Sequence, residues 1–160
     1  MSFLNANGMN SYDQPPGRKK VPFWGERVST SHAFIAGKRC LVMDDEYLIA
    51  LDIQLTLESA GATVVCLGDA GAALKLLRGG ATFDCAILDI VLGGPGQNSL
   101  TVAAMLTEQG TPFVFLTGMR ADNEHAKGFP DAPVLEKPCR AETLMEALRR
   151  ALDDESTRRG

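Results

Sequence analysis

Four short apolar runs in this sequence each end in polar residues that can bind a cation or a phosphoryl group. The runs and the residues that follow them are Leu41–Met43 with Asp44-Asp45-Glu46, Ala86–Leu88 with Asp89, Phe113–Leu116 with Thr117-Gly118, and Val134-Leu135 with Glu136-Lys137-Pro138. Short apolar runs between turn signals are typical of parallel strands buried on both faces. Parallel strands end at one shared edge, where open α/β sheets place their sites. The sequence therefore predicts carboxylates, a hydroxyl and an ammonium along one edge.

Strand-like and helix-like segments alternate from Arg39 to about residue 152. The predicted strands are about 39–44, 63–67, 84–88, 112–117 and 133–136. The predicted helices are about 46–60, 69–78, 99–109 and 140–152, and the polar stretch 118–132 allows only a short or irregular helix. This alternation predicts a single α/β domain with a parallel sheet, helices on both faces and right-handed crossovers.

The two ends of the chain differ from this central domain at 38–152. Residues 1–37 contain Pro15-Pro16-Gly17 and a basic cluster, and their four basic and two acidic residues give a net charge of +2. We expect this extension to be mostly disordered, although Phe23-Trp24 and Phe34-Ile35 could dock on another surface. Residues 153–160 are expected to form a charged tail.

Composition limits the classes of function. A formal net charge of −4 argues against DNA as the main partner, and no apolar stretch reaches the roughly 20 residues that membrane insertion needs. The N-terminus does not have the pattern of an export signal. Cysteines stand at positions 40, 66, 85 and 139, without the C-x-x-C spacing of zinc or dithiol sites. We therefore expect a reduced, cytoplasmic protein.

Over about residues 38–152 the sequence resembles the receiver domain of two-component response regulators. The resemblance rests on an acidic pair after the first strand, an aspartate after the third, a threonine after the fourth and Lys-Pro after the fifth. These residues are Asp44, Asp45, Asp89, Thr117, Lys137 and Pro138. Each element alone is weak, but all of them in order at strand ends are specific. The resemblance implies a flavodoxin-like, doubly wound (βα)5 fold with sheet order 2-1-3-4-5.

The residues suit the chemistry that the resemblance implies. Crowded carboxylates repel one another unless a cation intervenes, and Mg²⁺ prefers oxygen ligands. We expect Asp45 and Asp89 to be direct ligands and Asp44 to act through water, and the resemblance adds the backbone carbonyl of Val91. It also implies that Asp89 is the phosphoacceptor, attacking a phosphohistidine to give an aspartyl phosphate. Lys137 would then stabilise the transferring oxygens.

Three further features follow from the resemblance. The Thr117 hydroxyl would donate to a phosphoryl oxygen, Gly118 would leave room for that group, and the Lys137–Pro138 bond is expected to be cis. Val134 stands where many receivers carry an aromatic residue that changes position with the threonine.

In part, the sequence looks like the stand-alone FATGUY receivers of alphaproteobacteria. Phe115, Thr117 and Gly118 fit that motif, whereas Met119 and Arg120 replace a small residue and a tyrosine, and Cys139 replaces the aromatic that often follows Lys-Pro.

The expected function is that of a stand-alone response regulator, a phosphoacceptor protein that catalyses only its own phosphorylation and dephosphorylation. Its expected partners are a sensor histidine kinase or histidine phosphotransfer protein and a downstream protein, as a monomer or weak phosphorylation-dependent dimer. It would signal through protein contact, around 118–152, or serve as a phosphate sink. One alternative is a receiver-fold binding module that works without phosphorylation. A second is a Mg²⁺-dependent phosphohydrolase, although Val91 stands where such enzymes commonly place their second aspartate.

Overall fold

The computed structural model describes residues 30–93, 99–118 and 123–160, which form a five-stranded parallel sheet. The strands are β1 (Arg39–Met43), β2 (Thr63–Leu67), β3 (Cys85–Asp89), β4 (Phe113–Thr117) and β5 (Val134–Glu136). Their order, β2-β1-β3-β4-β5, confirms the predicted flavodoxin-like, doubly wound fold. β1 therefore lies directly beside β3, with Met43 paired to Leu88, and the acidic residues after these strands are brought to one place.

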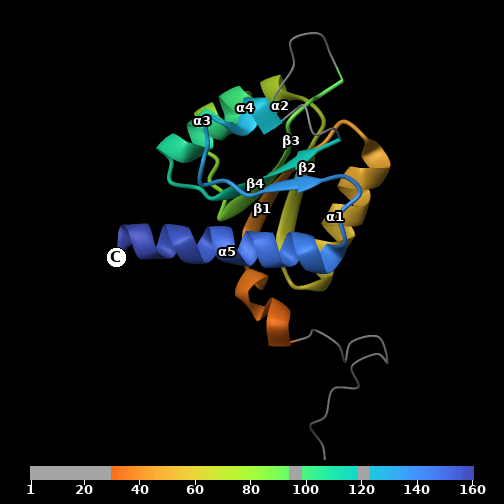
Figure 1. Ribbon diagram of the computed structural model, residues 1–160, viewed down its shortest axis with the longest axis vertical. Coiled ribbons are helices and arrows are strands. Elements are labelled where there is room, and N and C mark those ends of the chain that lie inside the picture. The colour runs from red at the N-terminus through yellow and green to blue at the C-terminus, as the bar shows by residue number, and fades with distance from the viewer. Residues whose placement is uncertain (1–29, 94–98, 119–122) are drawn as a thin grey trace, which may run out of the picture.

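Helices cover both faces of the sheet (Figure 1). α1 (Tyr47–Ser59) and α5 (Ala141–Arg159) lie on one face, and α2 (Ala70–Arg78), α3 (Leu100–Glu108) and the short α4 (Asn123–Ala126) lie on the other. The core is accordingly divided into two apolar clusters, one on each side of the sheet. All five residues of β3 and of β4 are buried, which explains their unbroken apolar runs.

Local sequence signals set several element ends close to the predicted positions. The Asp69 carboxylate accepts a hydrogen bond of 2.8 Å from the Ala72 backbone N–H and caps α2. Gly61 and Gly110 follow α1 and α3 with φ of 93° and 66°, a conformation that favours glycine. Ser99 precedes α3 as predicted, but its buried hydroxyl makes no capping bond.

The N-terminal extension is ordered over its last part, so the prediction of disorder over 1–37 is wrong for residues 30–37. Thr30–Ile35 form a 3-10 helix, η2, and the side chain of Ile35 is fully buried in the cluster between the sheet and α1 and α5. The Gly37 N–H donates to the Gly61 carbonyl at 2.8 Å, which joins this segment to the end of α1. The gain from burying Ile35 explains why this piece folds. Residues 1–29 lie outside the described residues.

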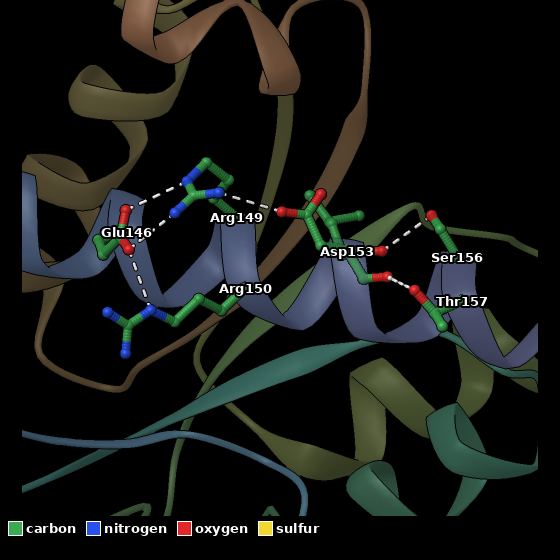
Figure 2. Close-up of polar contacts among 7 residues, drawn as sticks. Glu146, Arg149, Arg150, Asp153, Ser156 and Thr157 are labelled. Carbon is green, nitrogen blue, oxygen red and sulfur yellow. Dashed lines mark hydrogen bonds and ion pairs between the residues drawn. The ribbon is translucent and has the colours of Figure 1, made fainter.

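The last helix is longer than predicted: α5 continues through the expected tail to Arg159. Its polar face carries ion pairs at helical spacing, from Arg149 to Glu146 at 2.8 Å and to Asp153 at 3.1 Å (Figure 2). Arg159 also donates to the carbonyl of Gly110, and this contact joins the end of α5 to the turn before β4. None of the helices in the described parts of the chain has the length and apolar character that crossing a bilayer requires.

Candidate functional site at the carboxyl edge of the sheet

The carboxyl ends of β1, β3 and β4 carry buried polar residues. Asp44, Asp89 and Thr117 are 3%, 4% and 3% exposed, respectively. Asp44 and Asp89 come from neighbouring strands, and Asp89 is the last residue of β3. The fold therefore brings together side chains that are 45 positions apart in the sequence, as the strand-end pattern predicted.

Lys137, just after β5, reaches across to these carboxylates. Its Nζ lies 2.7 Å from Asp44 Oδ2, 2.8 Å from Asp89 Oδ2 and 3.4 Å from Glu46 Oε1. The backbone holds the lysine in place, because the Lys137 N–H donates to the Thr117 carbonyl at 2.7 Å and the Lys137–Pro138 peptide is cis, as expected. Since the charged side chain of Lys137 is only 10% exposed, solvent screens these pairs weakly.

The surroundings raise the pKa values of both Asp89 and Lys137. Burial raises the pKa of Asp89 above its ordinary value, and the Asp44 carboxylate raises it further, while Lys137 and the Val91 N–H act against this shift. Burial tends to lower the pKa of Lys137, but hydrogen bonding and charge from Asp44 and Asp89 outweigh it, so this pKa is raised. The lysine is therefore charged at any physiological pH.

Asp45 is placed differently from the prediction that it is a direct metal ligand together with Asp89. Its Oδ2 accepts a 2.8 Å hydrogen bond from the Gly93 N–H, so the side chain is turned to the loop after β3. Asp44, predicted to act through water, is the residue that lies beside Asp89 and Lys137. Both residues lie beyond Met43, the last residue of β1, so strand alternation does not set their directions, and the hydrogen bond from Gly93 holds the Asp45 side chain toward the loop. The contact with Gly93 is also close, since a Cβ there would overlap Asp45 Oδ2.

Glu46 is a member of the site that the sequence analysis did not single out. Carboxylate oxygens of Asp44, Glu46 and Asp89 lie within 4.8 Å of one another. Glu46 N–H also donates to Asp44 Oδ1 at 2.9 Å, which fixes that carboxylate. The acidic run Asp44-Asp45-Glu46 was the available signal, but the sequence does not say which of its side chains turn inward.

The remaining predicted site residues flank this cluster. Val91, whose carbonyl was a predicted ligand, donates its N–H to Asp89 Oδ1 at 3.2 Å, and its side chain is about half exposed. Thr117 ends β4 in register with Glu136, and Gly118 has open space where a side chain would stand. Val134 lies in β5 at the edge of the sheet and is partly exposed. Met119 and Arg120 lie outside the described residues.

The chemistry of these side chains fits a divalent cation. Three carboxylates from two strand ends supply hard oxygen donors, the type that Mg²⁺ prefers. Among the described residues, the buried Asp44 Oδ2 has the Lys137 ammonium as its partner at 2.7 Å, and Lys137 is shared with Asp89. Buried anionic oxygens in such a position are stabilised by a further cation.

A family model and several solved structures point to one family. The model of the response regulator receiver domain family matches residues 40–149. A receiver protein from Sinorhizobium medicae WSM419 is 30% identical, covers 74% of this chain and 97% of its own, and has a TM-score of 0.68. SdrG from Sphingomonas melonis Fr1 is 34% identical, covers 72% and 97%, and has a TM-score of 0.62. No curated protein matches the chain.

The fold and the site thus define a doubly wound α/β domain, in which acidic side chains at the ends of β1 and β3 face a lysine after β5. The match over residues 40–149 makes the assignment specific: this chain belongs to the response regulator receiver domain family. Receiver domains in general bind Mg²⁺ through such an acidic cluster and work with histidine kinases or phosphotransfer proteins. The comparison does not extend to residues 1–39.

An exposed apolar surface beside the site was also missed by the sequence analysis. Tyr47 and Leu48, in the first turn of α1, are 74% and 76% exposed, and Leu55 further along is 57% exposed. Leu48, Leu51 and Leu55 stand at helical spacing and so share one face of α1. The buried residues of α1 are instead Ala50, Ile53 and Leu57. Since α1 is apolar on both sides, periodicity alone could not say which side packs on the sheet.

Proposed function

We propose that this chain is a stand-alone, cytoplasmic response regulator that accepts a phosphoryl group on Asp89 from a histidine kinase or histidine phosphotransfer protein. In this proposal it catalyses only its own phosphorylation and dephosphorylation, and it acts by binding another protein or as a phosphate sink. Its four cysteines are free thiols, which suits a reducing compartment.

One observation carries this proposal above the others. A lysine ammonium lies within hydrogen-bond distance of Asp89 and Asp44 at the carboxyl edge of the sheet, with all three groups largely buried. A cation in contact with Asp89 Oδ2 can also contact an oxygen of a phosphoryl group entering at that carboxylate. A salt bridge for stability alone would not need a second buried carboxylate, which adds repulsion.

The residues divide the work of phosphoryl transfer. Asp89 supplies the attacking oxygen, and its contact with the Val91 N–H fixes the carboxylate orientation. Lys137 offsets negative charge on the transferring oxygens, and its ion pair with Asp44 keeps it aimed at the site. Thr117 would donate its hydroxyl to a phosphoryl oxygen, and the open space at Gly118 admits that group.

We propose that Mg²⁺ is held by the carboxylates of Asp44 and Asp89 and by the Val91 carbonyl. The carboxylate of Glu46 or Asp45 would lie near the ion and add negative charge. Bound there, Mg²⁺ would reduce the repulsion between the carboxylates and draw charge from the phosphoryl oxygens. Asp45 would have to release the Gly93 N–H to act as a direct ligand.

The experiment is incubation with acetyl phosphate and Mg²⁺, followed by intact mass measurement. Wild type should gain about 80 Da, the mass of one phosphoryl group replacing hydrogen, and Asp89→Asn should gain nothing. Asp154→Asn is the matched control, because it removes an exposed aspartate on α5, away from this edge, and should behave as wild type. Equal phosphorylation of Asp89→Asn, or none of wild type, would refute the proposal.

A protein phosphodonor has to contact the surface beside Asp89, and the exposed Tyr47 and Leu48 lie there. Leu48→Ser should therefore slow phosphotransfer from a phosphorylated histidine protein at least several-fold, while leaving the rate with acetyl phosphate unchanged. The corresponding change two turns along, Leu55→Ser, serves as the control. A Leu48→Ser protein that loses both activities equally would indicate a damaged site and count against a docking role.

The binding module that works without phosphorylation makes a different prediction for the same reagents. It expects Asp89→Asn to match wild type in every partner-binding assay, with or without phosphodonor.

The phosphohydrolase alternative expects turnover of small phosphate esters. The apolar side chain of Val91 can supply no proton to a leaving group, so we expect no turnover.

A further inference from the structure

Two of the four thiols lie in contact at the opposite end of the same two strands. Cys40 is the second residue of β1 and Cys85 the first residue of β3, and the two are directly paired in the parallel register. Their Sγ atoms are 3.3 Å apart, and both residues are fully buried. The phosphoryl transfer proposed at Asp89 uses neither thiol, so this contact has no part in the proposed function.

The spacing between the two paired strands is compatible with a disulfide. Neighbouring strands lie about 4.7–4.9 Å apart, within the roughly 4.4–6.8 Å that disulfides span between Cα atoms. Both side chains leave their strands on the same face, because both belong to the apolar cluster under α1 and α5. An approach of the two sulfurs by little more than an ångström would bring them to the bonding distance of about 2.05 Å.

The contact between the two thiols also affects their acidity. The hydrogen bond with Cys85 lowers the pKa of Cys40, and the same contact together with burial raises the pKa of Cys85. Loss of a proton is therefore easier at Cys40 than at Cys85. The thiolate is the form that reacts with oxidants.

Both thiols lie at the beginning of their strands. Cys40 directly follows Arg39 and Cys85 directly follows Asp84, and both of these preceding residues are exposed. The thiols are the first buried residues of β1 and β3, and the ends of strands open locally more readily than their centres. Cys66 and Cys139 are partly exposed, but nothing places either of them beside a second thiol.

We propose that Cys40 and Cys85 are a redox modification site, which forms a reversible disulfide between β1 and β3 when the protein meets a hydroperoxide. The Cys40 thiolate attacks one peroxide oxygen, an S–O bond forms as the O–O bond breaks, and water leaves after protonation. Cys85 sulfur then attacks the sulfenic sulfur, the S–S bond forms, and the departing hydroxide takes the Cys85 proton. The two thiols lose two electrons in total, and one hydrogen peroxide becomes two waters.

The disulfide would join the two strands that end in Asp44 and Asp89, each four residues beyond its cysteine. It would therefore link the redox state of the protein to the part of the sheet that carries the acidic site. Formation of the bond does not depend on phosphorylation, so it can be tested separately.

The test treats the folded protein with millimolar hydrogen peroxide, removes the peroxide with catalase, denatures, alkylates with N-ethylmaleimide and measures intact mass. Untreated wild type should take up four adducts, one for each cysteine, and treated wild type two. Dithiothreitol after the peroxide should restore all four. Peptide mapping should find the cross-link between the peptides that contain Cys40 and Cys85.

The double variant Cys66→Ala/Cys139→Ala keeps only the proposed pair and is the sharpest version of the test. Peroxide should reduce its adducts from two to none, whereas Cys85→Ala should form no intramolecular cross-link. If the double variant keeps both adducts, or if Cys40 gains two oxygens as a sulfinic acid in place of the cross-link, the proposal is wrong. Peptide mapping of wild type decides the matter should the double variant not fold.

Discussion

At the scale of single residues, Lys137 balances a buried excess of negative charge. It is one ammonium in contact with two buried carboxylates and one exposed carboxylate. Removing a carboxylate and removing the lysine should therefore change stability in opposite directions. In an ordinary stabilising salt bridge, removing either partner lowers stability. Opposite effects would therefore indicate a site in which the carboxylates repel each other.

Asp89→Asn should stabilise the protein at neutral pH without Mg²⁺, by roughly 0.5–2 kcal/mol. Because the folded-state pKa of Asp89 is raised, the folded protein holds this proton to higher pH than the unfolded chain. Stability of wild type should therefore fall as pH rises from the ordinary aspartate pKa of about 3.9 through the raised value. Urea unfolding of both proteins across this range should show the variant becoming more stable than wild type as the pH rises. A wild type that is more stable than Asp89→Asn at neutral pH would contradict the raised pKa of Asp89.

Lys137→Ala should destabilise the protein by about 3–5 kcal/mol at neutral pH in EDTA, because it leaves Asp44 and Asp89 buried without a cation. Lys127→Ala is the matched control, since its ion pair with Glu124 is exposed and should contribute less than about 1 kcal/mol. Chemical unfolding of the two variants under identical conditions measures both. Equal losses would mean that burial does not govern the Lys137 pairs.

At the scale of elements, two segments fold where the sequence predicted none. The last two turns of α5 are polar, and the apolar pair Phe34-Ile35 at the end of η2 is too short for periodicity to extend the domain over it. The structure shows different physical causes: one buried side chain for η2, and surface ion pairs for the end of α5. These causes predict very different energetic consequences.

Ile35→Ala should cost about 2–5 kcal/mol, because a fully buried side chain leaves a cavity in the cluster under α1 and α5. Leu55→Ala, at an exposed position of α1, should cost under about 0.5 kcal/mol. Thermal or urea unfolding compares the two. A loss at Ile35 as small as that at Leu55 would show that η2 does not dock on the domain.

Truncation after Leu152 should cost no more than about 1 kcal/mol, although it removes part of a regular helix. The described residues from 153 onward include none that is buried, and their ion pairs are largely exposed. Unfolding of the truncated chain, compared with full length at matched salt, checks this. A loss of several kcal/mol would mean that the contact between Arg159 and the Gly110 carbonyl contributes far more than an exposed bond does.

At the scale of the whole molecule, the strand-end pattern was enough to predict the edge where the site lies, and the resemblance to receiver domains implied the sheet order that the structure has. β2 was predicted at its observed bounds, and Asp44, Asp89, Thr117 and Lys137 lie where the parallel strands end. Side-chain direction after a strand was not predictable, because the loop at Gly93 decides that Asp45 turns away. The contact between Cys40 and Cys85 was equally hidden, since it depends on the exact register of β1 against β3.

Binding of Mg²⁺ should stabilise the whole domain by mass action, by about 2.7 kcal/mol at a free concentration one hundred times the Kd. Thermal unfolding should move to higher temperature with added Mg²⁺ in wild type and in Asp154→Asn, and much less in Asp44→Asn or Asp89→Asn. A shift of equal size in all four proteins would place the ion elsewhere.

The central claim is that the acidic edge directs a phosphoryl group onto one particular carboxylate. Reduction of the phosphorylated protein with borohydride converts an acyl phosphate on aspartate into homoserine, and peptide mass mapping then locates the residue. The account predicts conversion at Asp89 and at no other aspartate. Conversion at Asp44 or Asp45 instead, or none in a protein that carries the phosphoryl group, would contradict it.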